Sequence, residues 1–288
     1  MTEFGIVESQ IPPWLQVYLW LLIGCGVVCL IILYHKFRNS TLWKSTNNLS
    51  GWSIPWTDFG LIIWLMFFSV FILQLILSLL FRMPQINESS TQTWHTIFTG
   101  LAMQLGIISS YAYIRKTQPE LFLDKINCKP LSLLPAAAIA GFIFLASFPT
   151  IALTSYFWQN FLFVLQGLGL DISINPQDIV LSMKNAPSFP AMISMTLLAI
   201  VGAPIVEELV FRGSLYRFLK FRMSKTSAVL ISAGVFASIH SNLTGFFPLL
   251  ILGIFLCLSY EISGNLKVPI LMHAIFNLNS VFLIFSLK

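Results

Sequence analysis

The chain has 288 residues, of which only 9% are charged and 57% are hydrophobic, and its mean hydropathy is +0.83. Ordinary soluble domains are about a quarter charged and just under half apolar. These values exclude a disordered chain and are typical of a protein that crosses a membrane several times. The formal net charge is +5, but no basic and aromatic stripe suited to nucleic acid is present.

Eight apolar runs predict an all-α, polytopic membrane protein with about eight transmembrane helices. A spanning helix needs roughly 20 apolar residues, and only helices and closed barrels satisfy every backbone group in lipid. Barrel strands would be shorter and would alternate in polarity. The runs cover about residues 14–34, 59–81, 94–114, 131–157, 189–206, 228–240, 246–262 and 269–285. We expect residues 158–188 to form an outer loop with room for a short surface helix.

The basic residues divide unequally between the two sides that eight spans would create. Thirteen Lys and Arg fall on one side and three on the other, and cytoplasmic loops carry the excess of such residues. This predicts that both termini lie outside the cytoplasm and that residues 207–226 lie on the cytoplasmic side. The larger set is Lys36, Arg38, Lys44, Arg115, Lys116, Lys125, Lys129, Arg212, Arg217, Lys220, Arg222, Lys225 and Lys267, and the smaller set is Arg82, Lys184 and Lys288.

Two adjacent carboxylates, Glu207 and Glu208, directly follow the fifth apolar run. Pro204 removes a backbone hydrogen bond just before them and can kink the helix. Glu208 and Arg212 are spaced i,i+4 and can pair on one helical face, whereas Glu207 lies about 100° round the axis. This spacing predicts that Arg212 holds one carboxylate ionised while the other is free to carry a proton. The alternative is a solvated helix end at which these charges have no special role.

Two histidines lie in apolar helices of the last third of the chain. His240 follows Phe236 by one turn, and His273 precedes Asn277 by one turn. Taken singly, each can equally be a hydrogen-bonding group between helices. Together with a glutamate they form a set that can activate water and stabilise an oxyanion, or hold a divalent metal such as zinc. The chain contains no HExxH and no GxSxG motif.

These motifs, in this order, resemble those of the CPBP family of intramembrane proteases. The family includes the Ras-converting CAAX endopeptidases and the bacterial Abi proteins linked to bacteriocin processing and self-immunity. Residues 203–213 resemble its EExxxR motif, residues 236–240 its FxxxH motif and residues 273–277 its HxxxN motif. The resemblance covers residues 131–288 as a protease-like domain of about five spans. It leaves residues 1–130 as a variable N-terminal region of about three spans.

The resemblance implies catalytic roles for four residues. Glu207 would activate the attacking water, and His240 would share in positioning or activating it. His273 and Asn277 would stabilise the oxyanion of the tetrahedral intermediate. Whether a metal such as zinc takes part, and which residues would bind it, stays open.

Three further motif residues would support the site: Glu208 and Arg212 would organise it, and Phe236 would pack at its wall. We therefore expect a multi-pass endopeptidase of the bacterial cytoplasmic membrane, either glutamate-dependent or a metalloprotease. Its substrate would be a membrane-associated protein or peptide, lipidated or not, and CAAX processing and bacteriocin processing both stay open. The alternatives are a non-enzymatic bacteriocin-immunity or scaffold protein and a proton-coupled transporter.

Overall fold

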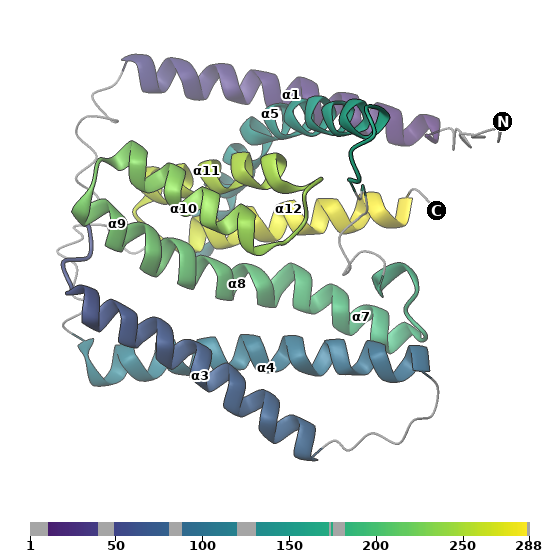
Figure 1. Ribbon diagram of the computed structural model, residues 1–288. Helices are drawn as coiled ribbons and strands as arrows, with labels where there is room; N and C mark the ends of the chain where they lie inside the picture. Colours follow the sequence, from purple (N-terminus) through teal and green to yellow (C-terminus); the bar gives the residue numbers. More distant parts are fainter. Residues whose placement is uncertain are drawn as a thin grey trace.

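The computed structural model describes residues 11–39, 49–80, 88–119, 131–172, 174 and 182–286. Within these ranges all regular structure is helical, which confirms the predicted all-α class. The segments are α1 Pro13–Asn39, α3 Trp56–Leu80, α4 Glu88–Thr117, α5 Leu133–Gly167, α7 Phe189–Leu197, η2 Leu198–Gly202, α8 Ala203–Glu208, η3 Leu209–Tyr216, α9 Arg217–Arg222, α10 Lys225–Ile239, α11 Phe246–Ser263 and α12 Lys267–Ser286, where η marks a π-helix (Figure 1).

Seven helical stretches in the described part of the chain are long and apolar enough to cross a membrane. One of them, Phe189–Arg222, joins α7, η2, α8, η3 and α9 into 34 continuous residues. The fifth span therefore does not end near residue 206 as predicted, because the backbone stays helical at every junction and carries the two glutamates near the middle of the stretch.

The sixth predicted span is α10, which has only 15 residues. Its length of about 22 Å is shorter than a hydrocarbon core of roughly 30 Å. α10 and α11 form a hairpin that begins and ends at the same end of the molecule, the left-hand end of Figure 1. The two helices approach closely at Gly253, where a Cβ atom would lie 2.9 Å from that of Ala233. The hairpin starts and ends on the same side, just as two full spans would. Every other connection between helices therefore lies on the side that the eight-span prediction gave it.

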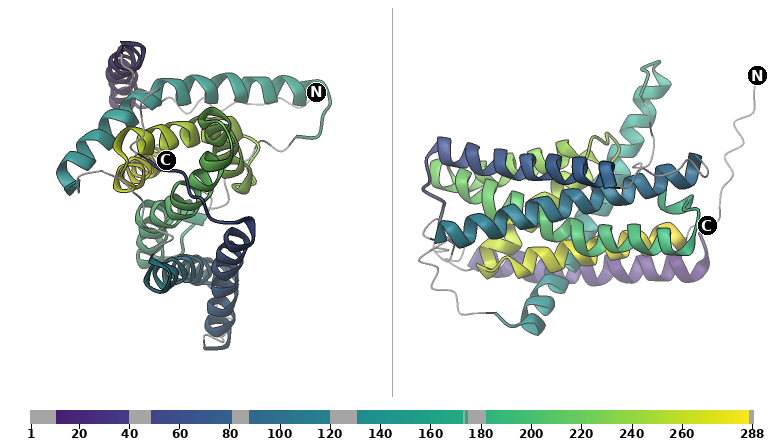
Figure 2. Two further views of the ribbon diagram at one scale, coloured as in Figure 1. Left: turned by 90° about the vertical axis from the view of Figure 1, so that its left-hand side faces the viewer. Right: turned by 90° about the horizontal axis from the view of Figure 1, so that it is seen from below.

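α5 is the longest helix, with 35 residues and Pro149 in its interior. Residues 158–167 continue this helix, so the predicted outer loop does not begin at residue 158. In the left panel of Figure 2, α5 lies lengthwise across helices that run toward the viewer. Its Trp158 donates a hydrogen bond from Nε1 to the carbonyl oxygen of Leu243 at 2.7 Å. The second half of α5 therefore holds the turn of the α10–α11 hairpin, residues 240–245. Residues 173 and 175–181 of the predicted loop lie outside the described part.

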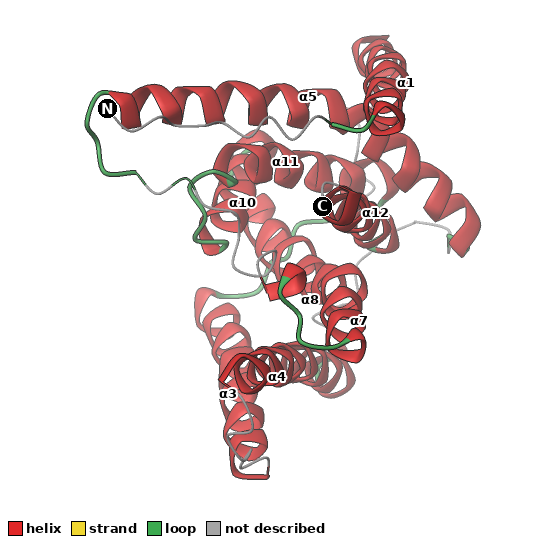
Figure 3. Cartoon of the chain, turned by 90° about the vertical axis from the view of Figure 1, so that its right-hand side faces the viewer, coloured by secondary structure: helices red, strands yellow, loops and turns green. Residues whose placement is uncertain are grey.

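The helices before residue 131 pack directly on those after it. α1 packs across α5 (Figure 3), and α4 packs on α7, η2 and α8. Leu33 of α1 belongs to the same buried cluster as Phe144 of α5, Phe236 of α10 and Met272 of α12. The N-terminal helices thus form part of the walls around the segment that carries the two glutamates.

Candidate active site

The helix that carries the glutamates widens into π-helical turns on both sides of them. η2 precedes the six-residue segment α8 and η3 follows it. Within η3, Ser214 Oγ donates a hydrogen bond to the carbonyl oxygen of Leu209 at 3.0 Å. This backbone carbonyl of the π-helical turn thereby gains a donor. Single π-helical turns inside α-helices are frequent at functional sites. Glu207 and Glu208 therefore occupy a short regular segment between two irregular ones.

Pro204 explains why the first wide turn needs partners from other helices. Because proline has no N–H, a carbonyl about one turn earlier loses its usual donor. Asn277 of α12 donates from Nδ2 to the carbonyl oxygen of Ala199 at 2.8 Å. Gln104 of α4 donates from Nε2 to the carbonyl oxygen of Leu198 at 3.0 Å. Two side chains from distant parts of the chain thus fix η2 in place, and Asn277 has one of its amide hydrogens engaged.

Glu208 forms a buried polar cluster with Arg212 and His273. Glu208 and Arg212 are both 0% exposed, and Arg212 Nη1 lies 2.9 Å from Glu208 Oε1. The same oxygen lies 2.9 Å from His273 Nδ1. An ionised carboxylate only accepts hydrogen bonds, so Nδ1 carries the proton and Nε2 faces the other way. The solvated helix end considered above is therefore wrong, because neither charge reaches water.

Arg212 and Phe236 hold this cluster from the α10–α11 hairpin. Arg212 Nη2 donates to the carbonyl oxygen of Gly253 at 3.2 Å. Its guanidinium carbon lies 4.5 Å from the centroid of the fully buried Phe236 ring, within the range of a cation–π contact. The same ring packs edge-on against His240 and His273, with centroid separations of 4.8 and 5.8 Å. Phe236 therefore packs against both imidazoles as well as the guanidinium.

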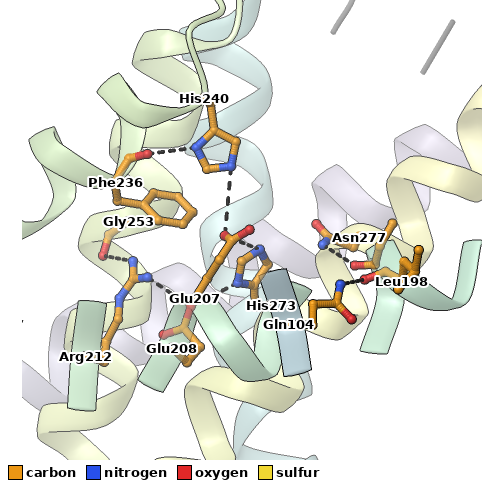
Figure 4. Close-up of polar contacts among 11 residues, drawn as sticks. Gln104, Leu198, Glu207, Glu208, Arg212, Phe236, His240, Gly253, His273 and Asn277 are labelled. Atoms are coloured by element: carbon orange, nitrogen blue, oxygen red, sulfur yellow. Dashed lines mark hydrogen bonds and ion pairs between the residues drawn. The ribbon is translucent and has the colours of Figure 1, made fainter. Parts of the chain in front are cut away.

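Glu207 points away from Glu208 and Arg212 and toward His240 and His273 (Figure 4). Its Oε2 lies 3.9 Å from His240 Nε2 and 3.8 Å from His273 Nε2. This oxygen has no hydrogen-bond partner among the described residues. His240 Nδ1 is 2.7 Å from the carbonyl oxygen of Phe236. A carbonyl can only accept, so Nδ1 of His240 is the donor and its Nε2 is turned to the glutamate. Three polar atoms thus converge at separations just beyond hydrogen-bond length.

The converging groups form the inner end of a cavity of about 510 Å³. Its walls are mostly apolar side chains, among them Ile97, Met103, Met195, Leu198, Phe276 and Val281. Asn277 lines it together with Glu207 and both histidines. The motifs did not indicate the polar wall residues that α4, α5 and the hairpin turn contribute, which are Thr96, Gln104, Ser155, Gln159, Asn242 and Thr244. The only sequence signal for any of them is that Thr96, Gln104 and Ser155 are polar residues inside apolar runs.

The donor types at this site, one carboxylate and two imidazoles, are those of zinc sites. In the part of the chain that the structure describes, however, no group of three or more His, Cys, Asp or Glu side chains is arranged to hold a metal ion. The described side chains at this site therefore do not fit a metal centre.

Comparison with known proteins identifies one segment of the chain. Residues 189–279 match the family model described as "Type II CAAX prenyl endopeptidase Rce1-like". The matched segment contains all three motifs, so it includes every residue named above for the site except those of α4 and α5 and Val281 of α12. No curated protein and no solved structure matches the chain.

Proposed function

We propose that this integral membrane protein hydrolyses peptide bonds with glutamate-activated water, because residues 189–279 match the Rce1-like CAAX endopeptidase family model and the described part of the chain has seven membrane-length helices. The family match supports an intramembrane endopeptidase in general. The observation that carries the mechanism is the position of Glu207 Oε2 opposite His240 Nε2 and His273 Nε2 at the inner end of the cavity.

Glu207 is the general base in this proposal. A water molecule placed between its Oε2 and His240 Nε2 would bridge two groups that are too far apart to bond directly. The water oxygen attacks the carbonyl carbon of the scissile bond while one of its protons moves to Glu207. The same proton then passes to the leaving amine as the carbon–nitrogen bond breaks. Positioned general bases of this kind accelerate reactions by roughly 10²–10⁴-fold.

His273 and Asn277 are the proposed partners of the oxyanion that forms on the attacked carbonyl. His273 can donate from Nε2 only as an imidazolium, because Nδ1 already bonds Glu208. Asn277 has a second amide hydrogen beyond the one bonded to Ala199. Preorganised donors of this type are worth several kcal/mol to an oxyanion.

The substrate class and the location follow from the same proposal. The mostly apolar cavity wall suits an apolar stretch of a membrane-associated protein or peptide, lipidated or not. We place the protein in the bacterial cytoplasmic membrane, where bacteriocin leaders are one class of candidate substrate. If it were a non-enzymatic immunity or scaffold protein instead, the open carboxylate of Glu207 would be dispensable.

The decisive experiment compares the purified Glu207→Gln protein with wild type on a library of quenched fluorescent peptides. Glutamine keeps the shape of the side chain but cannot take a proton, so we expect a loss in cleavage rate of roughly 10²–10⁴-fold with an unchanged unfolding midpoint. The matched control is Asp171→Asn, which makes the same exchange at an exposed position after α5. Equal cleavage by the Glu207→Gln and wild-type proteins would refute the proposed function.

A further inference from the structure

The described Lys and Arg residues gather at one end of the molecule. α1 and α4 end there with basic last turns, α9 ends there, and α10 and α12 begin there (Figure 1). We call this the cationic end. Nine of the eleven described basic residues belong to it: Lys36, Arg38, Arg115, Lys116, Arg217, Lys220, Arg222, Lys225 and Lys267. Of the other two, Arg212 is buried in the site, and Lys184 lies just before α7 at the opposite end. Because cytoplasmic connections carry the excess of Lys and Arg, the cationic end faces the cytoplasm.

The cavity extends from Glu207 toward the opposite end, from which Figure 3 views the molecule. Its lining residues in α4 include Thr96 and Ile97, which are near the start of that helix. Those in α12 extend to Val281 and Ile284, near its last residue. None of the described lining residues belongs to α3, α9, or residues 225–239 of α10. The open volume thus lies between the middle of the fold and the outer end.

The cationic end, by contrast, is closed by the segment 49–55. Trp52 N donates to the carbonyl oxygen of Arg217 at 2.8 Å, and Arg222 Nη1 donates to that of Trp52 at 3.2 Å. The ring of Phe59 stacks on Phe218 with a centroid separation of 3.8 Å. These contacts cover α9 with backbone and aromatic rings, and no residue of α9 is among the described residues that line the cavity.

The turn of the α10–α11 hairpin, residues 240–245, indicates that the cavity holds water. α10 rises only about 22 Å from the cationic end, so the turn lies at a depth where lipid surrounds the protein. Asn242 and Thr244 line the cavity there, and Asn242 Oδ1 accepts from Thr244 Oγ1 and Gly245 N, both at 2.6 Å. Non-helical backbone at membrane depth is tolerated where it is buried in protein or lines a water-filled cavity. The water for hydrolysis can therefore enter from the outer end.

We propose that the scissile segment reaches Glu207 from the non-cytoplasmic side of the membrane, through the cavity between α4 and the end of α12. This inference rests on the proposed function. The substrate is a polypeptide whose cleaved segment lies at or near the outer face. That segment is uncharged, because Glu207 and the two histidines are the only ionisable side chains among the described lining residues.

Thiol labelling tests the route with the full chain in right-side-out spheroplasts. Cys25, Cys29, Cys128 and Cys257 are first replaced by alanine, and one cysteine is then introduced. The Ile284→Cys variant reports on the cavity mouth, Val281→Cys is a second mouth position, and Thr117→Cys is the matched control at the exposed end of α4. The probe is a bulky, membrane-impermeant maleimide.

We expect both mouth variants to be labelled in intact spheroplasts and Thr117→Cys only after permeabilisation. The reverse pattern overturns the proposal. After purification, the labelled mouth variants should lose most of their peptide cleavage because the adduct blocks entry, while labelled Thr117→Cys keeps its rate. Full cleavage by a labelled mouth variant also overturns the proposed route.

Adding Glu207→Gln to the Ile284→Cys protein separates this inference from the proposed function. Labelling does not depend on hydrolysis, so the double variant should be labelled from outside and cleave no peptide. Outside labelling combined with undiminished cleavage by the double variant refutes the catalytic role of Glu207 and leaves the orientation standing. Labelling only after permeabilisation, with cleavage lost, refutes the orientation alone.

Discussion

The described part of the protein contains two buried clusters built from a carboxylate and cations, and only one of them has a member that lines the cavity. In the site, Glu208 accepts from Arg212 and His273. Near the cationic end, Glu261, which is 1% exposed, accepts from Tyr216 at 2.7 Å and from Lys220.

The difference between the clusters lies in their surroundings. Beside Glu208 a second carboxylate, Glu207, faces a cavity and two imidazoles. Beside Glu261 the neighbouring space is filled by buried side chains of the same core, such as Phe218 and Leu49. A buried carboxylate with cationic partners is therefore enclosed by packed side chains in one region, and in the other it stands beside a second carboxylate that lines the cavity.

The largest expected effect comes from removing the cation of the site cluster. Arg212→Met leaves Glu208 fully buried with only His273 as a partner, and breaking a buried ion pair typically costs about 3–5 kcal/mol. We expect the unfolding midpoint in detergent to fall accordingly. Lys220→Met is the matched change in the other cluster and should cost less, because Lys220 is 12% exposed and Tyr216 still bonds Glu261. A larger loss for Lys220→Met would contradict the ranking of the two clusters.

A second prediction separates stability from catalysis. Tyr216→Phe removes one hydrogen bond to the buried carboxylate of Glu261 and should destabilise the protein by roughly 1.5–3 kcal/mol. Because this cluster lies outside the cavity, the cleavage rate per folded molecule should equal that of wild type. Thermal unfolding and peptide cleavage on the same preparation check both halves. A large drop in specific activity at full folding would show that the two clusters are coupled.

A third prediction concerns the contact that joins α4 to the site. A Cβ atom on Gly202 would lie 1.8 Å from Gln104 Oε1, so Gly202→Ala must displace the glutamine. Both Gly202→Ala and Gln104→Ala then lose the bond to Leu198, at an expected cost of about 1 kcal/mol each. The double variant should cost little more than either single one, because residues in contact are not additive. Fully additive losses in unfolding free energy would show that this contact does not carry the effect.

The smallest effect is expected at the edge of the second cluster. Lys225 Nζ lies 3.4 Å from Glu261 Oε2 and is 20% exposed. Partly exposed pairs of this kind contribute about 0–1 kcal/mol, so Lys225→Met should shift the unfolding midpoint only slightly. A loss as large as that of Tyr216→Phe would mean that Lys225, rather than the tyrosine, holds Glu261 in place.

Local spacing explains what could be predicted about the site. Glu208 and Arg212 pair as expected because residues four apart share a helical face, and Glu207 diverges from them for the same reason. The contact between His273 and Glu208 joins residues 65 positions apart. No periodicity specifies such a contact, so the motifs placed both residues in one site but did not indicate which atoms would meet.

Helix ends and partners were less predictable. Pro204 indicated that the helix can kink, and the residues just before it form a π-helical turn that Asn277 and Gln104 complete from other helices. The continuation of the helix to residue 222 was missed because charged residues usually mark the end of a span. Here Glu208 and Arg212 neutralise each other, and packing against α10, α11 and α12 removes them from lipid.

By itself, the sequence determined the membrane environment, the all-α class, the unequal division of Lys and Arg between the two sides of the membrane, and the three motifs. Each of these depends on composition or on residues within a few positions of one another. Only the tertiary structure decided which carboxylate is buried and which faces the cavity, how far the α10–α11 hairpin rises, and at which end the cavity lies. These features depend on how distant helices fill space around the site, and packing of that kind leaves no local pattern in the chain.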